Sequence, residues 1–245
     1  MANAIRHITS ARRSIPGKST ELSVVIPAAG VGKRMRSKDP KVLTEIALNT
    51  TLIERQLDLI WHVYPKADIL LTVGYKADVI RKKLQKYPIR YIYNPLFETT
   101  GVAFSISLAL QAAISKYCLV IYGDLIFNND AISSITDGKS KILIDDTNNF
   151  NEDEVGLIVD EKKHISNFSF GLSKKWSQIA YLEGKELELF KVACYNEDTI
   201  RWFGYEALNQ IIDNGGTLES HSVPSAMVFD IDTPQDLQKA KSILN

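Results

Sequence analysis

The stretch Ser23–Lys41, SVVIPAAGVGKRMRSKDPK, determines how the rest of the chain is interpreted. It opens on a short apolar run, Val24–Ile26, which is bounded by turn residues and therefore predicts a strand buried in a parallel sheet. Gly30 and Gly32 follow among basic side chains. Glycine permits the positive φ angles and close backbone approaches that phosphate-binding loops require. We therefore predict that the loop after this strand binds an anion.

The glycines alone leave two other interpretations open. They are also compatible with an ordinary strand-to-helix turn whose lysines are solvated. A dinucleotide-binding loop of the form G-x-G-x-x-G would need a small residue at position 35, where Met35 stands. The sequence therefore disfavours an NAD site.

The composition is that of an ordinary globular protein, and its charge balance restricts the partners we expect. The 245 residues are 45% apolar and 24% charged, and 29 basic side chains balance 29 acidic ones. This balance gives no overall positive field, so we expect no nucleic-acid partner. Cys118 and Cys194 lie in apolar runs and are expected to be reduced core residues. No apolar run is long enough to span a membrane, so we expect a cytoplasmic protein without a membrane partner, and we leave a homodimer open.

Strand and helix patterns alternate in the first half of the chain. Buried strands are predicted at Asp68–Val73, Ile89–Tyr93 and Cys118–Tyr122, and helices at Thr51–Tyr64, Ala77–Tyr87 and Val102–Ala113. This alternation predicts a parallel sheet with helices on both faces. Because the carboxyl ends of parallel strands meet at one edge, the polar segments Gly30–Lys41, Asn94–Gly101 and Gly123–Asp124 should meet in one crevice.

The pattern changes after residue 137. Strands are predicted at Lys141–Asp146, Val155–Asp160, His164–Phe170, Leu187–Cys194, Leu218–Val223 and Met227–Ile231, a polar loop at Thr147–Glu154, and helices at Asn196–Ile212 and Thr233–Leu244. The predicted fold class is α/β: a Rossmann-like three-layer α/β/α architecture with a mostly parallel mixed sheet and a small antiparallel lobe. Residues 1–20 carry basic residues and no acidic one, and they are expected to form a flexible arm before a single domain at 21–245.

Two acidic elements are candidates for holding Mg²⁺. Asp124 follows an apolar strand, and Asp230 and Asp232 alternate within a strand, so their side chains should point to one face. Carboxylate oxygens are ligands that Mg²⁺ prefers. Two capping roles compete with this prediction: Asp124 could cap a short helix near Asn128, and Asp232 could cap the last helix of the chain.

These elements resemble signatures of the nucleotidyltransferase superfamily. Ala28–Met35 followed by Pro40-Lys41 is similar to the pattern A-A-G-x-G-x-R-M with P-K. Gly123-Asp124 and Asp230–Leu237 look like the two metal-binding motifs of sugar nucleotidyltransferases and their cytidylyltransferase relatives.

A further segment resembles the bacterial choline-phosphate cytidylyltransferase branch of this superfamily. Asn94–Ser105 is similar to the branch pattern N-P-x-Y-x-x-T-N-N-x-x-S, although Gly101 and Val102 replace the two asparagines. Leu187–Lys191 resembles the acceptor-side strand of that branch.

The resemblance implies a role for each part of the site. It implies catalytic roles for Arg34 and Lys41 and an Mg²⁺ cofactor held by Asp124, Asp230 and Asp232. It implies nucleotide binding by Ala28, Ala29, Gly30, Val31, Gly32, Lys33, Asn94, Thr100, Gly101, Ser105 and Gly123. Acceptor-binding candidates are Trp176, Tyr181, Glu188 and Lys191, the aromatic ones as part of a box for a cationic group. Residues 21–137 are then the nucleotide-binding half and residues 138–245 the acceptor-binding half.

The implied activity is Mg²⁺-dependent transfer of CMP from CTP to a small phosphorylated or phosphonylated acceptor, with release of pyrophosphate. Such products serve capsule or surface polysaccharide or phosphonate synthesis. The sequence leaves the acceptor open among phosphocholine-like, phosphonate and phosphoglutamine-like compounds. Two alternatives remain: a sugar-1-phosphate nucleotidyltransferase, and a nucleotide-binding module without catalysis.

Overall fold

The structure is a computed structural model that describes residues 22–35, 38–146, 152–195, 197–223 and 227–244, without the side chains of Lys33 and Glu197. The expected arm at residues 1–20 and most of the expected polar loop at 147–154 lie outside these residues.

The first half of the chain alternates strands and helices as predicted. Its elements are β1 (Ser23–Ala28), η1 (Lys33–Met35), η2 (Lys41–Leu43), β2 (Glu45–Ala47), β3 (Thr50–Thr51), α2 (Leu52–Val63), β4 (Asp68–Val73), α3 (Ala77–Lys83), β5 (Arg90–Tyr93), α4 (Val102–Ala112), β6 (Tyr117–Ile121), β7 (Leu125–Phe127) and α5 (Asp130–Ser133). The helix predicted to reach Tyr87 ends four residues earlier, at Lys83.

The second half combines mostly antiparallel strands with further helices. Its elements are β8 (Lys141–Asp145), β9 (Val155–Val159), β10 (Ile165–Phe170), β11 (Lys174–Glu183), α6 (Gly184–Cys194), η3 (Glu197–Thr199), α7 (Gly204–Asp213), β12 (Glu219–His221), β13 (Val228–Asp230) and α8 (Pro234–Leu244). The single helix predicted over Asn196–Ile212 is instead η3 followed by α7.

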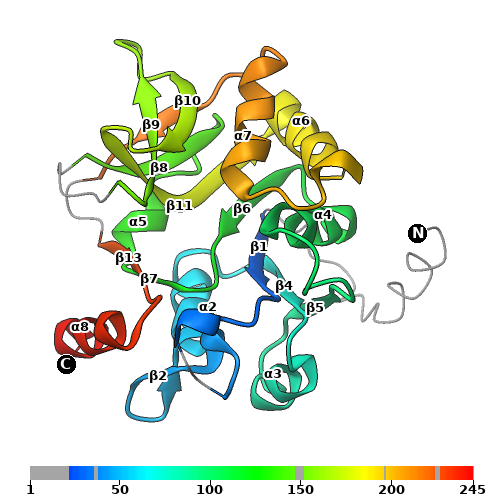
Figure 1. Cartoon of the computed structure of the whole chain (residues 1–245), viewed down its shortest axis with the longest axis vertical. Helices are drawn as coiled ribbons and strands as arrows, with labels where there is room; N and C mark the ends of the chain where they lie inside the picture. Colours follow the sequence, from blue (N-terminus) through cyan, green and yellow to red (C-terminus); the bar gives the residue numbers. More distant parts are fainter. Residues whose placement is uncertain (1–21, 36–37, 147–151, 196, 224–226, 245) are drawn as a thin grey trace.

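One mixed sheet runs through both halves of the chain. Its nine strands include the path β10-β9-β11-β6-β1-β4-β5, with β8 beside β11 and β12 beside β8. The strands β6, β1, β4 and β5 are parallel, and β11 joins them antiparallel to β6. The chain adds β4 and β5 on one side of β1 and β6 on the other, so the strand order reverses at β1 (Figure 1). In open α/β sheets a ligand site is expected at this reversal.

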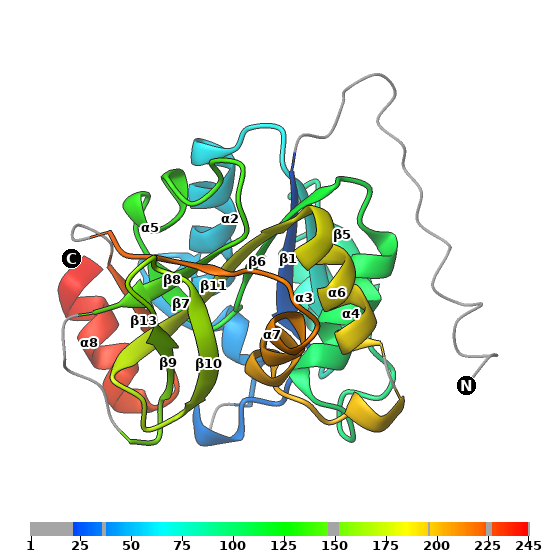
Figure 2. The same ribbon diagram turned by 90° about the horizontal axis from the view of Figure 1, so that it is seen from above.

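Helices cover both faces of this sheet, which gives the three layers (Figure 2). The alternating side chains of β1 show why its sequence is a continuous apolar run. Val25 packs in the core shared with α4, α6 and α7, whereas Val24 and Ile26 pack in the core shared with α2, α3 and α5. A strand with both faces buried needs apolar residues at every position.

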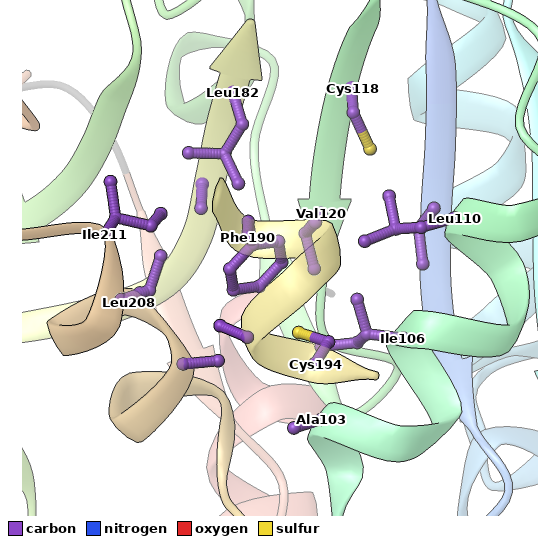
Figure 3. Packing of buried hydrophobic residues seen from close by; sticks show 14 of the residues in the cluster. Ala103, Ile106, Leu110, Cys118, Val120, Leu182, Phe190, Cys194, Leu208 and Ile211 are labelled. Atoms are coloured by element: carbon purple, nitrogen blue, oxygen red, sulfur yellow. The ribbon is translucent and has the colours of Figure 1, made fainter. Parts of the chain in front are cut away.

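The strand predicted at Leu187–Cys194 is wrong, because this segment lies within helix α6. Its buried positions are Leu187, Phe190, Ala193 and Cys194, a spacing of three and four residues that is helical. Figure 3 shows Phe190 and Cys194 among residues of β6 and α4. Both cysteines are buried and unbonded to each other, as expected. The strand that lies beside β6 on the side away from β1 is β11, and the sequence analysis did not predict this strand.

Candidate active site

A cavity of about 340 Å³ opens at the carboxyl ends of β1 and β6, where the strand order reverses. It is lined by Pro27, Ala28, Gly30, Gly32, Arg34, Lys41, Val42, Gly123, Asp124 and Asp232. Six predicted phosphate- or nucleotide-binding residues and two predicted metal ligands therefore share one cavity. Pro27 and Val42 are lining residues that the sequence did not single out.

Two glycines allow the chain segments around the cavity to approach closely. Gly32 has a φ of +66°, and a Cβ there would lie 2.9 Å from Cβ of Lys41. A Cβ on Gly123 would lie 2.9 Å from the carbonyl oxygen of Pro27. Larger residues at these positions would push the glycine loop away from Lys41 and the β6 end away from β1.

Lys41 is the centre of an ion network in the cavity. Its Nζ lies 2.8 Å from Oδ2 of Asp124 and 2.5 Å from Oδ1 of Asp232. The guanidinium of Arg34 lies 2.8 Å from Oδ2 of Asp232. Only 12% of the Lys41 side chain is exposed, whereas 74% of the Arg34 side chain is exposed. Both predicted catalytic cations therefore contact acids that were predicted to bind metal.

The acids come together because the ends of two distant segments pair. Strands β7 and β13 are antiparallel and align Asp230 with Leu125, the residue after Asp124. The backbone nitrogen of Ile231 also donates to the carbonyl oxygen of Asp124 at 2.9 Å. These contacts place Asp232 beside Asp124, although the two lie far apart in sequence.

The two competing capping roles are taken by other side chains. Oδ2 of Asp236 accepts from the backbone nitrogen and the hydroxyl of Thr233 at 2.7 and 2.8 Å, as its capping-box spacing predicted. Near α5, Oδ1 of Asn128 accepts from the backbone nitrogen of Ala131. The carboxylates of Asp124 and Asp232 are thus directed at Lys41 rather than at helix ends.

The network shifts the pKa values of its members. Burial acts against the charge of Lys41, but Asp124 and Asp232 outweigh it and raise the lysine pKa. Burial also acts to raise the pKa of Asp232, but Lys41 and Arg34 outweigh it and lower that pKa. For Asp230, burial raises the pKa, Lys175 opposes the rise and the nearby charge of Asp232 adds to it. Lys41 and Asp232 are therefore a charged pair at neutral pH.

The donor atoms fit a divalent cation. Oδ1 of Asp124 is buried and has no hydrogen-bond partner among the described residues, so one hard oxygen is free to coordinate. Mg²⁺ is usually held by one or two carboxylates together with substrate phosphates. Asp124 and Asp232 can supply those carboxylates. Within the described part of the chain no three acidic, histidine or cysteine side chains form a ready-made cage, and the role of Asp230 as a third ligand stays a prediction.

The segment predicted to hold the base is braced by its own hydrogen bonds. The side-chain nitrogen of Asn94 donates to the hydroxyls of Thr100 and Ser105 at 3.1 and 3.0 Å, and its oxygen accepts from the backbone nitrogen of Leu96. The backbone nitrogen of Gly101 donates to the carbonyl oxygen of Ile200 at 2.8 Å. These residues do not line the cavity described above.

The predicted acceptor-binding residues lie away from the cavity. Trp176 and Tyr181 are 5% and 3% exposed and belong to the two cores, which is the common role of strand aromatics. Glu188 and Lys191 pair with each other at 2.7 Å on helix α6. A residue that the sequence did not single out lies closer to the acids: Lys175 on β11, whose Nζ is 3.7 Å from Oδ1 of Asp230.

Gln56 on α2 supports the turn that carries Asp124. It is fully buried, and its side-chain nitrogen donates to the carbonyl oxygens of Tyr122 and Leu125 at 3.1 and 2.7 Å. These two carbonyls flank Gly123-Asp124. No pattern in the sequence indicates this role, because a glutamine within an amphipathic helix is usually solvated.

We predict that Gln56→Met, which keeps the side-chain length but removes both donated bonds, lowers turnover by roughly 10–100-fold, as loss of groups that orient metal ligands does. Arg55→Met is the control, because Arg55 donates to the carbonyl oxygen of Phe127 on the same β7 segment, farther from Asp124. Steady-state rates and melting temperatures of both variants check this. Equal activity loss in both variants at equal loss of stability would mean that Gln56 only holds the fold.

Comparison with known proteins finds relatives of this fold. Residues 24–141 match the MobA-like NTP transferase domain. The bifunctional protein GlmU of Synechococcus sp. is 38% identical over 105 residues, which are 43% of this chain and 16% of that protein. The chain thus spans less than a third of the length of the curated relatives that it matches.

Solved structures are similar over nearly the whole chain. The CTP:phosphocholine cytidylyltransferase of Streptococcus pneumoniae superposes with a TM-score of 0.72 at 20% identity, covering 92% of this chain and 100% of that one. The inositol-1-phosphate CTP transferase of T. maritima superposes with a TM-score of 0.73 at 19% identity, covering 92% and 97%. At such identities the likeness shows the fold.

Taken together, these similarities show the fold that nucleotidyltransferases have. Residues 24–141, just under half of the chain, are thus similar to the MobA-like NTP transferase domain. Among the described residues no helix is long and apolar enough to cross a membrane.

Proposed function

We propose that the protein is a Mg²⁺-dependent cytidylyltransferase that transfers CMP from CTP to a small phosphorylated or phosphonylated acceptor. The observation that carries this proposal is the contact of Lys41 with both Asp124 and Asp232 in the cavity beside the glycine loop. This arrangement combines a phosphate-binding cation with two acids suited to a divalent cation. The free oxygen of Asp124 supports the metal.

The chemistry needs positioning and charge neutralisation. An ionised oxygen of the acceptor phosphate attacks the α-phosphorus of the triphosphate. The new P–O bond forms as the bond from that phosphorus to the bridging oxygen breaks, and pyrophosphate leaves with the electron pair. The attacking oxygen is already ionised near neutral pH, so no side chain has to remove a proton. Catalysis then depends on holding the reactants in line and on cations around the phosphate groups.

The cavity residues divide these tasks. The backbone of the loop at Gly30–Gly32 and the exposed guanidinium of Arg34 are suited to the β- and γ-phosphates, which leave as pyrophosphate. Lys41, deeper in the cavity, is suited to the α-phosphate. A divalent cation on Asp124 and Asp232 would neutralise further phosphate charge.

CTP is proposed as the donor because Asn94–Ser105 is similar to the cytidylyltransferase segment. Both similar structures described above are of enzymes named as CTP-dependent transferases, which motivates the same choice. A pocket that hydrogen-bonds the polar groups of cytosine leaves buried groups unpaired with another base, which is the strongest route to base discrimination. Since the side chain of Asn94 is occupied within its own segment, backbone groups are proposed for these contacts.

The test is pyrophosphate release from CTP, UTP, ATP and GTP with a panel of acceptors: phosphocholine, phosphoethanolamine, 2-aminoethylphosphonate and glucose 1-phosphate. We expect release with CTP and an acceptor that is not a sugar phosphate. A preference for another base of about tenfold or more in kcat/KM, with glucose 1-phosphate as the best acceptor, would favour the sugar-1-phosphate alternative. Binding of triphosphate without release for any pair would favour a module that binds nucleotide without catalysis.

A further inference from the structure

The turn that follows β4 contacts the phosphate loop, residues 29–41, at two separate points. The backbone nitrogen of Tyr75 donates to the carbonyl oxygen of Ala29, where the loop begins, at 3.0 Å. Nζ of Lys76 donates to the carbonyl oxygen of Lys38, near the end of the loop, and lies 3.6 Å from Oδ1 of Asp39. The hydroxyl of Tyr75 also contacts the Lys38 carbonyl oxygen, at 3.4 Å. Two consecutive residues therefore hold both the start and the end of this loop.

Gly74 allows the turn to lie directly against the start of the loop. A Cβ at this position would lie 2.8 Å from the carbonyl oxygen of Ala29 and 2.6 Å from Cβ of Phe97. Phe97 belongs to the segment that is proposed to hold the base, and its ring centroid lies 6.4 Å from that of Tyr75. The turn is thus in contact with both parts of the proposed nucleotide site, and a side chain at Gly74 would push them away from it.

The backbone of Lys76 indicates that its side chain has a role outside helix α3. Lys76 is the N-cap residue of this helix, with a φ of 47° and a ψ of 41°, in the left-handed region. An N-cap residue usually has an extended backbone, and the left-handed region favours glycine, asparagine or aspartate. An unfavourable backbone conformation persists where the surrounding contacts outweigh its cost. Here those contacts are the bonds of Nζ to Lys38 and Asp39.

These bonds bear on a cation of the cavity, although Lys76 is not among the lining residues. Asp39 is followed by Pro40 and Lys41, and Lys41 lines the cavity. Proline fixes its own φ and restricts the backbone of the residue before it. A fixed Asp39 therefore also fixes the direction in which the chain enters Lys41.

We propose that Lys76 is a positioning residue that holds the phosphate loop in the conformation that binds triphosphate. This inference rests on the proposed function. The ammonium group of Lys76 lies 5.6 Å from the ring centroid of Tyr75, which supports it, and it bonds the loop at Lys38 and Asp39. Without these bonds the triphosphate itself has to order the loop, and this ordering costs conformational entropy. The loss then falls on the affinity for triphosphate rather than on kcat.

Binding of α,β-methylene CTP with Mg²⁺ to the full chain, measured by calorimetry, tests the inference. Lys76→Met keeps the side-chain length and removes the charge, and we expect it to bind the analogue about fivefold more weakly. This is the effect of losing one hydrogen bond in a side chain that is 37% exposed. KM for CTP should rise by a similar factor, with little change in kcat. Lys76→Arg is expected to restore most of the affinity.

Digestion with trypsin tests the same contacts without nucleotide. Trypsin cleaves after lysine and arginine, and residues 33–38 contain four of these. Cleavage of the folded protein within this stretch, located by mass spectrometry, should be several-fold faster in Lys76→Met than in the wild type, because a loop that opens more often is cleaved more often. Bound analogue should slow the cleavage in both proteins.

Two further variants separate the side chain from the backbone and from charge alone. Lys82→Met is the matched control, because Lys82 is exposed on the same helix and forms neither bond to Lys38 or Asp39. It should bind the analogue and resist trypsin as the wild type does. Lys76→Gly accepts the left-handed backbone, so it should keep the wild-type melting temperature and still bind the analogue more weakly.

Unchanged analogue affinity in Lys76→Met would overturn the inference, whatever the cleavage rate. Weaker binding without faster cleavage would also overturn it, because the lysine would then contact the nucleotide instead of holding the loop. Wild-type affinity in Lys76→Gly would show that the backbone at this position matters and the side chain does not. Failure of the wild type to bind any triphosphate analogue would contradict the proposed function itself, and the cleavage rates would still show whether Lys76 holds the loop.

Discussion

Replacing Lys41 by methionine is expected to lower kcat by roughly 10²–10³-fold, as loss of one transition-state charge stabiliser does. It is also expected to strengthen divalent-cation binding in the nucleotide-free protein. The second effect follows from the position of Nζ, which contacts Asp124 and Asp232 at 2.8 and 2.5 Å. Removing this ammonium group leaves Asp124 without a cationic partner and Asp232 with only the exposed Arg34, so a divalent cation then meets one competitor fewer there.

Rates of pyrophosphate release and titration with Mn²⁺, followed by electron paramagnetic resonance, measure the two effects separately. Lys141→Met is the matched control, because Lys141 is similarly buried, pairs with Asp137 and lies outside the cavity. Weaker Mn²⁺ binding in Lys41→Met would mean that the lysine holds the acids in their metal-binding positions. An effect on KM alone would mean that Lys41 binds the ground state and the transition state equally.

The parallel part of the sheet could be predicted from the sequence because each of its strands has a clear pattern within its own residues. Strands with two buried faces are continuous apolar runs, and Gly74 follows directly on the end of β4. The strand β11 could not be found in the same way. Its backbone bulges at Gln178, where φ is 57°, and its pairing partners change along its length, so it has neither a simple alternation nor a continuous apolar run.

Helix α6 was wrongly predicted to be a strand, whereas the strand β11 was not predicted at all. The letters ELEL at Glu186–Leu189 alternate as a strand would, but the segment is placed on the sheet by Leu187 and Phe190. Short alternations are compatible with both periods, and tertiary packing decides between them. The resemblance to an acceptor-side strand therefore failed on the same residues.

The candidate site was predictable where chain topology brings residues together. Gly30, Lys41 and Asp124 follow the ends of β1 and β6, which are neighbours in any sheet of this order. Gln56 was not predictable, because its role depends on partners outside its own element. The bonds of Gln56 span 66 and 69 residues of sequence. A polar residue inside a helix or strand carries no sign of such partners.

Asp124→Ala is expected to reduce turnover to background while leaving the stability of the fold nearly unchanged. Asp124 is a proposed metal ligand, and its Oδ1 is buried without a hydrogen-bond partner among the described residues, so the fold gains little from this oxygen. Lys41 keeps its contact with Asp232 at 2.5 Å when the other carboxylate is removed, and no buried charge is left unpaired. Residues whose geometry serves function rather than stability behave in this way.

Asp137→Ala provides the comparison, because Asp137 is also the partner of a buried lysine, Lys141, in a place that does not line the cavity. This variant should keep full turnover. Pyrophosphate release, Mn²⁺ binding and thermal unfolding of both variants are to be measured together. Asp124→Ala should lose Mn²⁺ binding as well as turnover. If it binds Mn²⁺ as tightly as the wild type and turns over at a comparable rate, Asp124 is not a metal ligand. A fall in melting temperature in Asp124→Ala but not in Asp137→Ala would mean that the contact between Asp124 and Lys41 stabilises the fold. The matched contact between Asp137 and Lys141 would in that case contribute little to stability.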